Sequence, residues 1–254
     1  YGLFSIGYNE AFYLDFTLRN DWSSNLSPEN WSYLYPSVSG SWLVHETFSL
    51  PDVVDFLKVR GSWAEVGSSG DLSSFRYFQY STNPSQYRGH PYGGLPGNRP
   101  NRSIHAEYTV SKELGLKAIL LGNRLDVDAT FYQTGTRDQI LNSPLPPSSG
   151  FNQGYINAGY INNSGVELSA SYDVLKDQKF NLTVGGNFTR QWSEVEELAE
   201  GQDIQVIGEA ADVVTAARMN QPVGMIMGTA FACNDEGKKI IDDDNRSEER
   251  RVGK

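Results

Sequence analysis

Strict alternation of apolar and polar residues is the feature of this sequence that most limits its fold. In AFYLDFTLRND, residues 11–21, the apolar set falls on one side of an extended chain: Phe12, Leu14, Phe16 and Leu18. The polar set falls on the other side: Tyr13, Asp15, Thr17 and Arg19. A period of two predicts a β-strand with two unlike faces. The question is whether the apolar face meets a protein core or lipid.

The same period recurs along the chain and predicts about eight strands, most near ten residues long. These strands are expected at residues 1–8, 11–21, 33–45, 57–66, 112–120, 124–134, 165–175 and 180–192. A tilted strand of about this length crosses a bilayer. No apolar run approaches the roughly 18 residues of a membrane-spanning helix, so any crossing is expected from strands.

The connections between these segments alternate in length, which favours a membrane barrel. The odd-numbered connections are short, near residues 8–11, 46–56, 121–124 and 176–179. The even-numbered ones are mostly long, near residues 22–31, 67–107, 134–163 and 193–245. All the long loops then emerge at one end of a meandering sheet, as in outer-membrane barrels with short periplasmic turns. A soluble sandwich has no general reason to sort its loops in this way.

The polar faces also suit the wall of a wet interior, because they carry charged residues in most of the predicted strands. These are Asp15, Arg19, Lys58, Arg60, Asp126, Asp128, Glu167 and Asp173. One face of a soluble antiparallel sheet is often polar too, so the loops and faces have to be taken together. We interpret the chain as all-β, a partial antiparallel up-and-down transmembrane β-barrel with lipid outside and water inside.

Aromatic residues near the predicted strand ends have two interpretations. They either form interfacial girdles of the barrel or simply reflect the preference of aromatic residues for strands. The set is Tyr13, Trp22, Trp42, Phe131, Tyr132, Phe180 and Trp192.

Composition and motifs argue against several other classes of protein. The net charge of −10 leaves no basic stripe for nucleic acid. The single cysteine, Cys233, excludes an internal disulfide framework and has no nearby zinc partner. Asp126 and Asp128 share a face and could resemble a hydrolase pair, but polar wall residues are the simpler interpretation. We expect no catalytic residues and no enzyme activity.

Several phrases, taken in order, carry a family resemblance. They are YLDFTLRNDWSSNL, YPSVSGSW, FLKVRGSWAEVG, NRLDVDATFYQTGTRDQI, NAGYINNSGVEL and QPVGMIMGTAF. The chain resembles the barrel of the SusC/RagA-type TonB-dependent transporters of Bacteroidota outer membranes. That resemblance implies a 22-stranded barrel with an N-terminal plug, of which this chain supplies about eight strands.

The resemblance also implies a function and partners. It implies active import of nutrients, usually oligosaccharides or peptides, driven by the TonB–ExbB–ExbD complex through an N-terminal region outside this chain. A SusD-like surface lipoprotein would close over the mouth of the channel, and lipid would surround the barrel.

The domain organisation expected from the sequence has two parts. Residues 1–245 would form part of the barrel domain. RSEERRVGK, residues 246–254, resembles a translated sequencing adapter and is expected to be a non-native tail. The alternative to a transporter is a soluble or surface-attached all-β module, either an adhesin or a carbohydrate-binding domain. Its strands would form a two-sheet Greek key with a filled core.

The long loop around residues 75–94 holds the candidate cargo-binding residues. They are Arg76, Tyr77, Tyr80, Tyr87, Arg88 and Tyr92. Aromatic rings stack on sugar faces and arginine supplies forked donors, so these residues suit contact with a glycan or peptide. The same rings could instead pack the loop against itself or contact the lid protein.

The acidic segment NDEGKKIIDDDN, residues 234–245, raises the possibility of a calcium site. Its oxygen ligands do not fall at the fixed spacing of an EF-hand loop. A solvated charged loop is the simpler account, and no cofactor is expected.

Overall fold

A computed structural model describes the chain over residues 1–70, 72, 81–94, 97–177, 179–210, 213–231, 233–234, 237–240 and 249–253. Of residues 81–87, 91–94 and 249–253 only the backbone is described. The chain divides into two compact units, residues 1–158 with 162–192, and residues 159–161 with 193–254.

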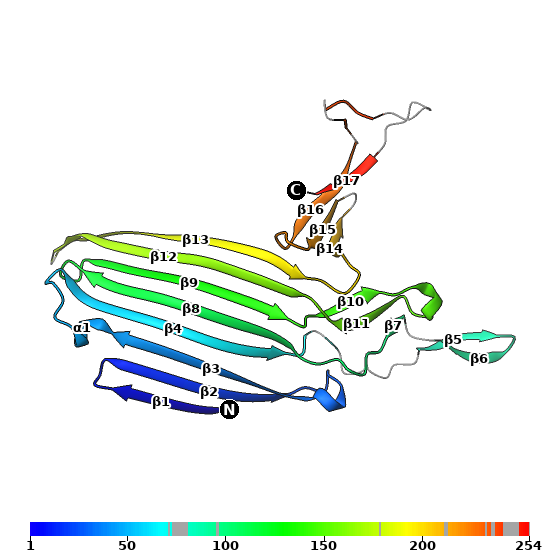
Figure 1. Cartoon of the computed structure of the whole chain (residues 1–254), viewed down its shortest axis with the longest axis horizontal. Helices are drawn as coiled ribbons and strands as arrows, with labels where there is room; N and C mark the ends of the chain where they lie inside the picture. Colours follow the sequence, from blue (N-terminus) through cyan, green and yellow to red (C-terminus); the bar gives the residue numbers. More distant parts are fainter. Residues whose placement is uncertain are drawn as a thin grey trace. The chain divides into compact units, whose positions relative to one another are not determined.

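The first unit is built on an eight-stranded antiparallel sheet in which sequence neighbours lie side by side (Figure 1). Its strands are β1 (Gly2–Tyr8), β2 (Phe12–Trp22), β3 (Ser32–Leu43), β4 (Val54–Ser68), β8 (Glu107–Leu120), β9 (Leu125–Arg137), β12 (Tyr160–Lys176) and β13 (Asn181–Glu197). The order β1-β2-β3-β4-β8-β9-β12-β13 is an up-and-down meander. It confirms the predicted partial barrel wall, and the two-sheet Greek key is wrong.

The connections confirm the predicted alternation, since the long ones lie at one end of the sheet (Figure 1). The opposite end carries tight turns, such as residues 121–124 between β8 and β9, and the short helix α1 (Val44–Thr47) between β3 and β4. The long connections hold small elements that the sequence did not predict. They are η1 (Pro28–Asn30), β5 (Ser81–Tyr87), β6 (His90–Gly94), β7 (Asn98–Arg99), β10 (Ile140–Pro144), η3 (Pro147–Ser149) and β11 (Gln153–Asn157).

The register of the sheet separates its two faces by residue type. Two neighbouring rows of in-register residues lie on the outward face. The first consists of Phe4, Phe16, Val38, Trp63 and Lys112. The second consists of Ile6, Leu14, Gly40, Gly61, Leu114 and Phe131. An inward row runs through Tyr13, Ser41, Arg60, Gly115 and Thr130. Because side chains alternate along each strand, the outward face is apolar and the inward face is polar and charged.

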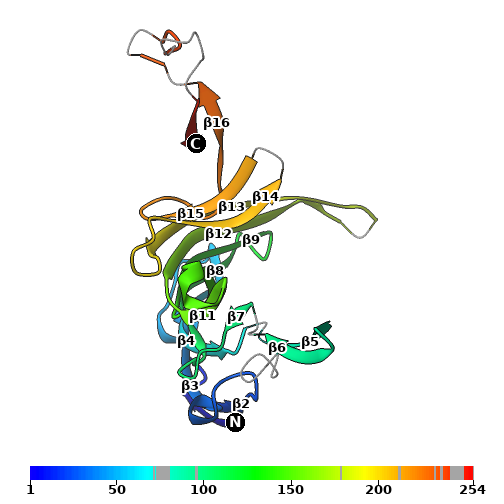
Figure 2. The ribbon, with the colours of Figure 1, turned by 90° about the vertical axis from the view of Figure 1, so that its right-hand side faces the viewer.

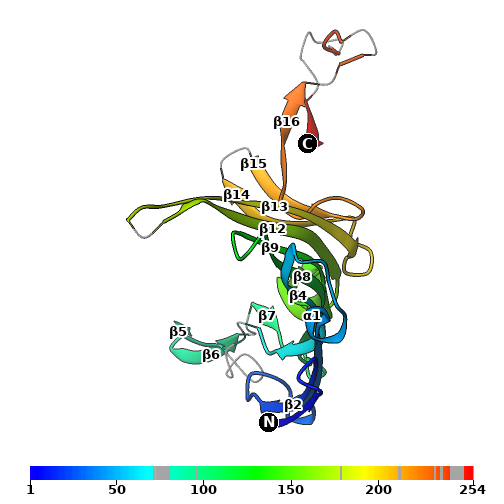
Figure 3. The ribbon, with the colours of Figure 1, turned by 90° about the vertical axis from the view of Figure 1, so that its left-hand side faces the viewer.

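Within the described residues of the first unit, no second layer covers the apolar face. Views along the strands show the sheet as one layer (Figures 2 and 3). Large apolar side chains from β1 to β13 remain exposed, among them Phe4 at 61%, Leu114 at 60% and Phe188 at 56%. A soluble protein rarely exposes so large a contiguous apolar surface, so this face is built to contact lipid. No helix among the described residues is long and apolar enough to cross a membrane.

On β8 and β9 polar side chains interrupt the apolar outward face toward the long loops, although Phe16, Val38 and Trp63 in the same row of β2 to β4 are still apolar. Beyond Leu114 and Phe131, the next outward residues are Lys112 and Gln133. Toward the short-turn end, Trp42 stacks on Phe12, with ring centroids 5.6 Å apart. On β8 and β9 the apolar band is therefore limited on the loop side, and the aromatic pair at the other end suits a membrane–water interface.

Two of the seven aromatic residues considered for the interfacial girdles lie on the wrong face for that role. Tyr13 is in register with Ser41 on the inward face, and its hydroxyl donates to the carbonyl oxygen of Glu10 at 3.1 Å. Tyr132 lies over Gly165 of β12. For these two residues the girdle interpretation is wrong. Side chains alternate between the two faces along a strand, so the apolar neighbours of Tyr13 and Tyr132 in the chain face outward and the two tyrosines face inward.

The second unit contains a four-stranded sheet where the sequence analysis expected only a long connection. Its strands are β14 (Ile204–Ala210), β15 (Val213–Arg218), β16 (Met225–Phe231) and β17 (Glu249–Gly253). Two small apolar clusters accompany it, one around Val195 and Ala217 and one around Ala216 and Met227. The strands β14, β15 and β16 were missed because they are short and Gly208, Ala216, Ala217 and Gly228 weaken their alternation. Strand β17 lies within residues 246–254, which were expected to be a non-native tail.

Candidate functional site

The inward face of the sheet is organised around Arg60 of β4. Its Nη1 donates to Oδ2 of Asp128 at 3.1 Å, and its Nη2 donates to Oδ1 at 2.8 Å. Nη2 also donates to Oγ1 of Thr130 at 2.6 Å. Asp128 and Thr130 belong to β9, so the guanidinium crosses β8 to reach them. This forked geometry is the one that arginine makes with carboxylates in its strongest pairs.

A glycine on β8 makes this crossing possible. Gly115 is in register with Arg60 on one side and with Thr130 on the other. A Cβ atom at residue 115 would lie 2.5 Å from Nε and 2.6 Å from Cζ of Arg60. The Arg60 side chain therefore occupies the space that any other residue at 115 would fill. The three strands are tied at one level of the wall by a single side chain.

The two aspartates that share a face on β9 are held by different cations. Asp128 binds Arg60, whereas Oδ2 of Asp126 lies 3.5 Å from Nζ of Lys117 on β8. Each carboxylate thus has its own counter-charge, and the two do not act as a pair. The structure supports their interpretation as polar wall residues, because a hydrolase pair needs both carboxyl groups free to face one substrate.

Filling the space above Gly115 is expected to detach Arg60 from Asp128. The substitution Gly115→Leu should cost about 1 kcal/mol of stability, because the paired side chains are about one-third exposed and water moderates the loss. The urea midpoint of the folded full-length barrel in detergent measures it. Gly186→Leu is the control, since a Cβ at that residue of β13 meets nothing within 4 Å. An equal midpoint shift in both variants would contradict the role of the Arg60 crossing.

The long loops of the first unit are joined into a platform at the end of the sheet, which we call the loop platform (residues 23–31, 97–106 and 138–157). Asparagine side chains make many of the joints. Nδ2 of Asn157 donates to the carbonyl oxygens of His105 at 2.8 Å and Asp138 at 2.9 Å, and its Oδ1 accepts from the backbone N–H of His105 at 3.0 Å. One side chain thereby fixes two loops that are about 50 residues apart in sequence.

Further contacts of the same kind extend the loop platform to a third loop. Nδ2 of Asn30 donates to the carbonyl oxygen of Ile104 at 3.1 Å, and Nδ2 of Asn101 donates to that of Tyr155 at 3.0 Å. Beneath these joints Leu26, Ile104 and Ala106 are almost fully buried. Buried apolar contacts and backbone hydrogen bonds together order these loops, which is unusual for long connections without function.

A polar groove of about 530 Å³ lies on the loop platform. Its lining comes from β7, the segment after β7, the residue after β10, and β11: Arg99, Pro100, Asn101, Arg102, Ser103, Leu145, Gly154, Tyr155 and Ile156. Two arginines, an amide and a hydroxyl in one groove suit hydrogen bonding to a polar ligand. The chain as a whole is acidic, so this groove is a locally basic feature.

The structure places the sequence-predicted cargo residues only in part. Arg76, Tyr77 and Tyr80 lie outside the described residues. Tyr87 and Tyr92 belong to the β5–β6 hairpin, of which only the backbone is described there, and Arg88 is exposed in its turn with φ 51°. Their role in cargo binding stays a prediction. The groove residues were not predicted as cargo-binding residues. The many aromatic residues of the preceding segment, 75–94, were taken as the signal for cargo binding, and the arginines and asparagines of residues 98–103 were not.

The acidic segment considered for calcium lies mostly outside the described residues, which do not include Asp235, Glu236 or residues 241–245. Among the residues that the structure does describe, no three His, Cys, Asp or Glu side chains are grouped to hold a metal ion. The expectation about calcium stays a prediction.

A one-layer antiparallel meander with a bounded apolar outer face, a charged inner face and long loops at one end defines the wall of an outer-membrane β-barrel. Comparison with protein families agrees. Residues 1–221 match the family described as "TonB dependent receptor-like, beta-barrel", and the chain belongs to this family. Its members are outer-membrane transporters and receptors and are not enzymes.

Individual relatives support the same assignment. TonB-dependent receptor SusC of Bacteroides thetaiotaomicron is 29% identical over 79% of this chain and 21% of its own length. TonB-dependent receptor P39 of Formosa agariphila is 26% identical over 82% of this chain and 20% of its own. The chain thus spans about a fifth of these relatives. The solved RagAB peptide transporter superposes with a TM-score of 0.81 at 22% identity, over 99% of this chain and 29% of that one, which shows the fold.

Proposed function

We propose that the full-length protein containing this chain imports nutrients across the outer membrane by the TonB-dependent route, with oligosaccharides or peptides as cargo. The observation that carries the proposal is the two-faced sheet. Its apolar outer side suits hydrocarbon, and its inner side presents Arg60, Asp128 and Lys117 to water. Membership of the TonB-dependent receptor family supports import that is driven through TonB.

The wall serves import through its hydrogen bonding and its polarity. In hydrocarbon every backbone N–H and C=O must be paired, and strand pairing along the sheet meets this need. A polar inner face lets a hydrophilic cargo pass without stripping its hydration. Asp128 neutralises Arg60, and Asp126 neutralises Lys117. Around these two ion pairs the described inner wall therefore offers hydrogen bonds to cargo but has little net charge that would hold a charged cargo in place.

The loop platform is the part of this chain that we propose contacts cargo and partner. Its groove is polar, preorganised by hydrogen bonds and located at the end of the sheet that faces outside in barrels of this type. The candidates Arg76, Tyr77, Tyr80, Tyr87, Arg88 and Tyr92 belong to the same set of loops. A SusD-like surface lipoprotein would cover these loops, and the TonB–ExbB–ExbD complex would act through the N-terminal region of the protein. The similarly folded RagAB complex is a peptide transporter, which supports peptides as one of the two cargo classes.

Uptake by intact cells tests the proposal. Cells with and without the gene for the full-length protein are given fluorescent dextrin oligosaccharides or a labelled tryptic digest of casein. We expect accumulation of one of the two probes to require the gene and to stop when a protonophore collapses the inner-membrane gradient. Accumulation that requires the gene but survives the protonophore would reject TonB-dependent import. Gene-independent accumulation of both probes would reject import of these cargo classes.

A further inference from the structure

A groove of about 400 Å³ crosses the outward face of the sheet near the short-turn end. It forms because two glycines are neighbours in register, Gly40 on β3 and Gly61 on β4. Leu14 flanks the pair from β2 and Leu114 flanks it from β8. Two adjacent positions without side chains leave a depression between apolar neighbours.

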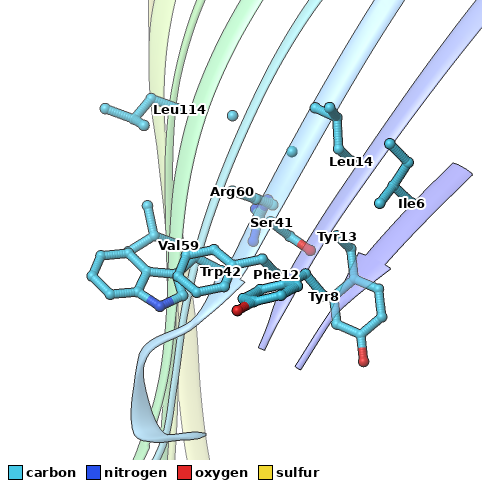
Figure 4. Close-up of a pocket in the computed structure, with 12 residues that line it drawn as sticks. Ile6, Tyr8, Phe12, Tyr13, Leu14, Ser41, Trp42, Val59, Arg60 and Leu114 are labelled. Atoms are coloured by element: carbon cyan, nitrogen blue, oxygen red, sulfur yellow. The ribbon is translucent and has the colours of Figure 1, made fainter. Parts of the chain in front are cut away.

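The outward side chains that line the groove are aliphatic and aromatic, whereas Tyr13, Ser41 and Arg60, which also border it, belong to the inward row. Figure 4 shows Leu114 on one side, Leu14 and Ile6 on the other, and Trp42 with Phe12 and Tyr8 toward one end. The two rings nearest each other are stacked, with Phe12 and Trp42 at an interplanar angle of 10°. Phe48, after α1, meets the Trp42 ring edge-on at 5.9 Å. The end of the groove is thus a rigid aromatic wall.

The polar edge of Trp42 shows how the groove is placed relative to the membrane. Its Nε1 donates to Oγ1 of Thr47 in α1 at 2.9 Å, in the connection at the short-turn end. An indole with its ring in an apolar surface and its N–H at a polar turn is typical of the membrane–water interface. Short turns of such barrels face the periplasm, so the groove lies in the inner leaflet.

The space above the two glycines is open. A Cβ at Gly40 would meet no atom closer than 3.8 Å, and one at Gly61 none closer than 3.7 Å. These are ordinary van der Waals distances, so larger residues would fit without moving the backbone. Packing within the described sheet therefore does not require glycine at either position, and the depression is available to a molecule outside the chain.

We propose that this groove binds one acyl chain of an inner-leaflet phospholipid, held against the Phe12–Trp42 stack. The groove is continuous with the exposed apolar side chains of the outward face, the face that suits lipid. Its outward lining comes from aliphatic and aromatic side chains that match a hydrocarbon chain. A flexible chain gains more contacts in a depression than on the ridged remainder of the face, so this lipid exchanges more slowly than its neighbours.

Brominated phospholipids test the proposal, because bromine quenches tryptophan emission only at contact distance. The full-length protein is placed in vesicles of phosphatidylethanolamine and phosphatidylglycerol whose acyl chains carry mid-chain bromines. The signal of Trp42 is the difference between the wild type and Trp42→Phe. We expect strong quenching of Trp42, and Gly61→Leu should lower it about twofold because the leucine displaces the chain from the groove.

Matched variants separate groove filling from other effects. Gly40→Leu fills the same groove from β3 and should repeat the loss of quenching, which also covers the case that Gly61→Leu fails to fold. Gly186→Leu adds the same side chain to the outward face of β13 and should leave the Trp42 signal unchanged. The proposal is overturned if both filled variants quench like the wild type. It is also overturned if Trp42 is not quenched in the wild type, as would occur if a second protein copy covered the groove.

Discussion

Replacing Leu168 by arginine is expected to cost the barrel about 2–4 kcal/mol, the range for a cation near the bilayer midplane on the lipid face. Leu168 lies in the middle of β12, and its side chain is 41% exposed on the outward face. Within the described sheet, no acidic side chain of the outward face is in place to pair with the new charge at that depth. The cost is that of placing a guanidinium in hydrocarbon.

The neighbouring substitution Ser169→Arg supplies the control, because it places the same charge one residue later on the inward face. Ser169 lines a polar recess with Glu167 and with Arg60, whose charge Asp128 already neutralises, so the new cation meets the Glu167 carboxylate and water. We expect this variant to change stability by less than about 0.5 kcal/mol. The fraction of full-length protein assembled in outer membranes and the urea midpoint of the purified barrel measure both. Equal losses in the two variants would mean that the faces are assigned wrongly.

The strands of the wall could be predicted from sequence because lipid imposes a simple rule on them. A strand between hydrocarbon and water needs an apolar residue at every second position, and β2 and β9 follow this rule over their central lengths. The alternation of short and long connections then predicted that strands adjacent in sequence are adjacent in the sheet. The strands of the second unit obey no such rule, and Ala216, Ala217 and Gly208 break the alternation on which the prediction relied.

The contacts that organise the inner wall and the loops were not predictable in the same way. Arg60, Gly115 and Asp128 occur on three strands, and only the register brings them to one level. Alternation excludes a slip of one residue, because it would swap the two faces, but a slip of two residues keeps both faces and changes which side chains share a level. Asn157 likewise carries no local signal, because its partners are His105 and Asp138, on two different loops.

Asn157→Ala is expected to loosen the loop platform. The substitution removes three hydrogen bonds that join residues 105, 138 and 157. Water can replace part of each bond because these groups are only half-buried, so the net loss is about 2 kcal/mol of local stability. Amide exchange in residues 98–106 should then become roughly thirtyfold faster, since local opening governs exchange there. Hydrogen–deuterium exchange on the full-length protein measures this change directly.

Asn152→Ala is the matched control, since Asn152 is in the same loop but exposed. Its backbone N–H donates to the carbonyl oxygen of Gly97 and its carbonyl oxygen accepts from the N–H of Leu145, and alanine keeps both bonds. Exchange in residues 98–106 should remain at the wild-type rate in this variant, and exchange in the centres of β8 and β9 should be unaffected in both. If cargo binds the groove lined by Arg99 and Arg102, Asn157→Ala should also weaken uptake, because the groove loses its preorganisation. Faster exchange that spreads into β8 would instead show that the loop platform and the barrel wall open together, and would contradict a local role for Asn157.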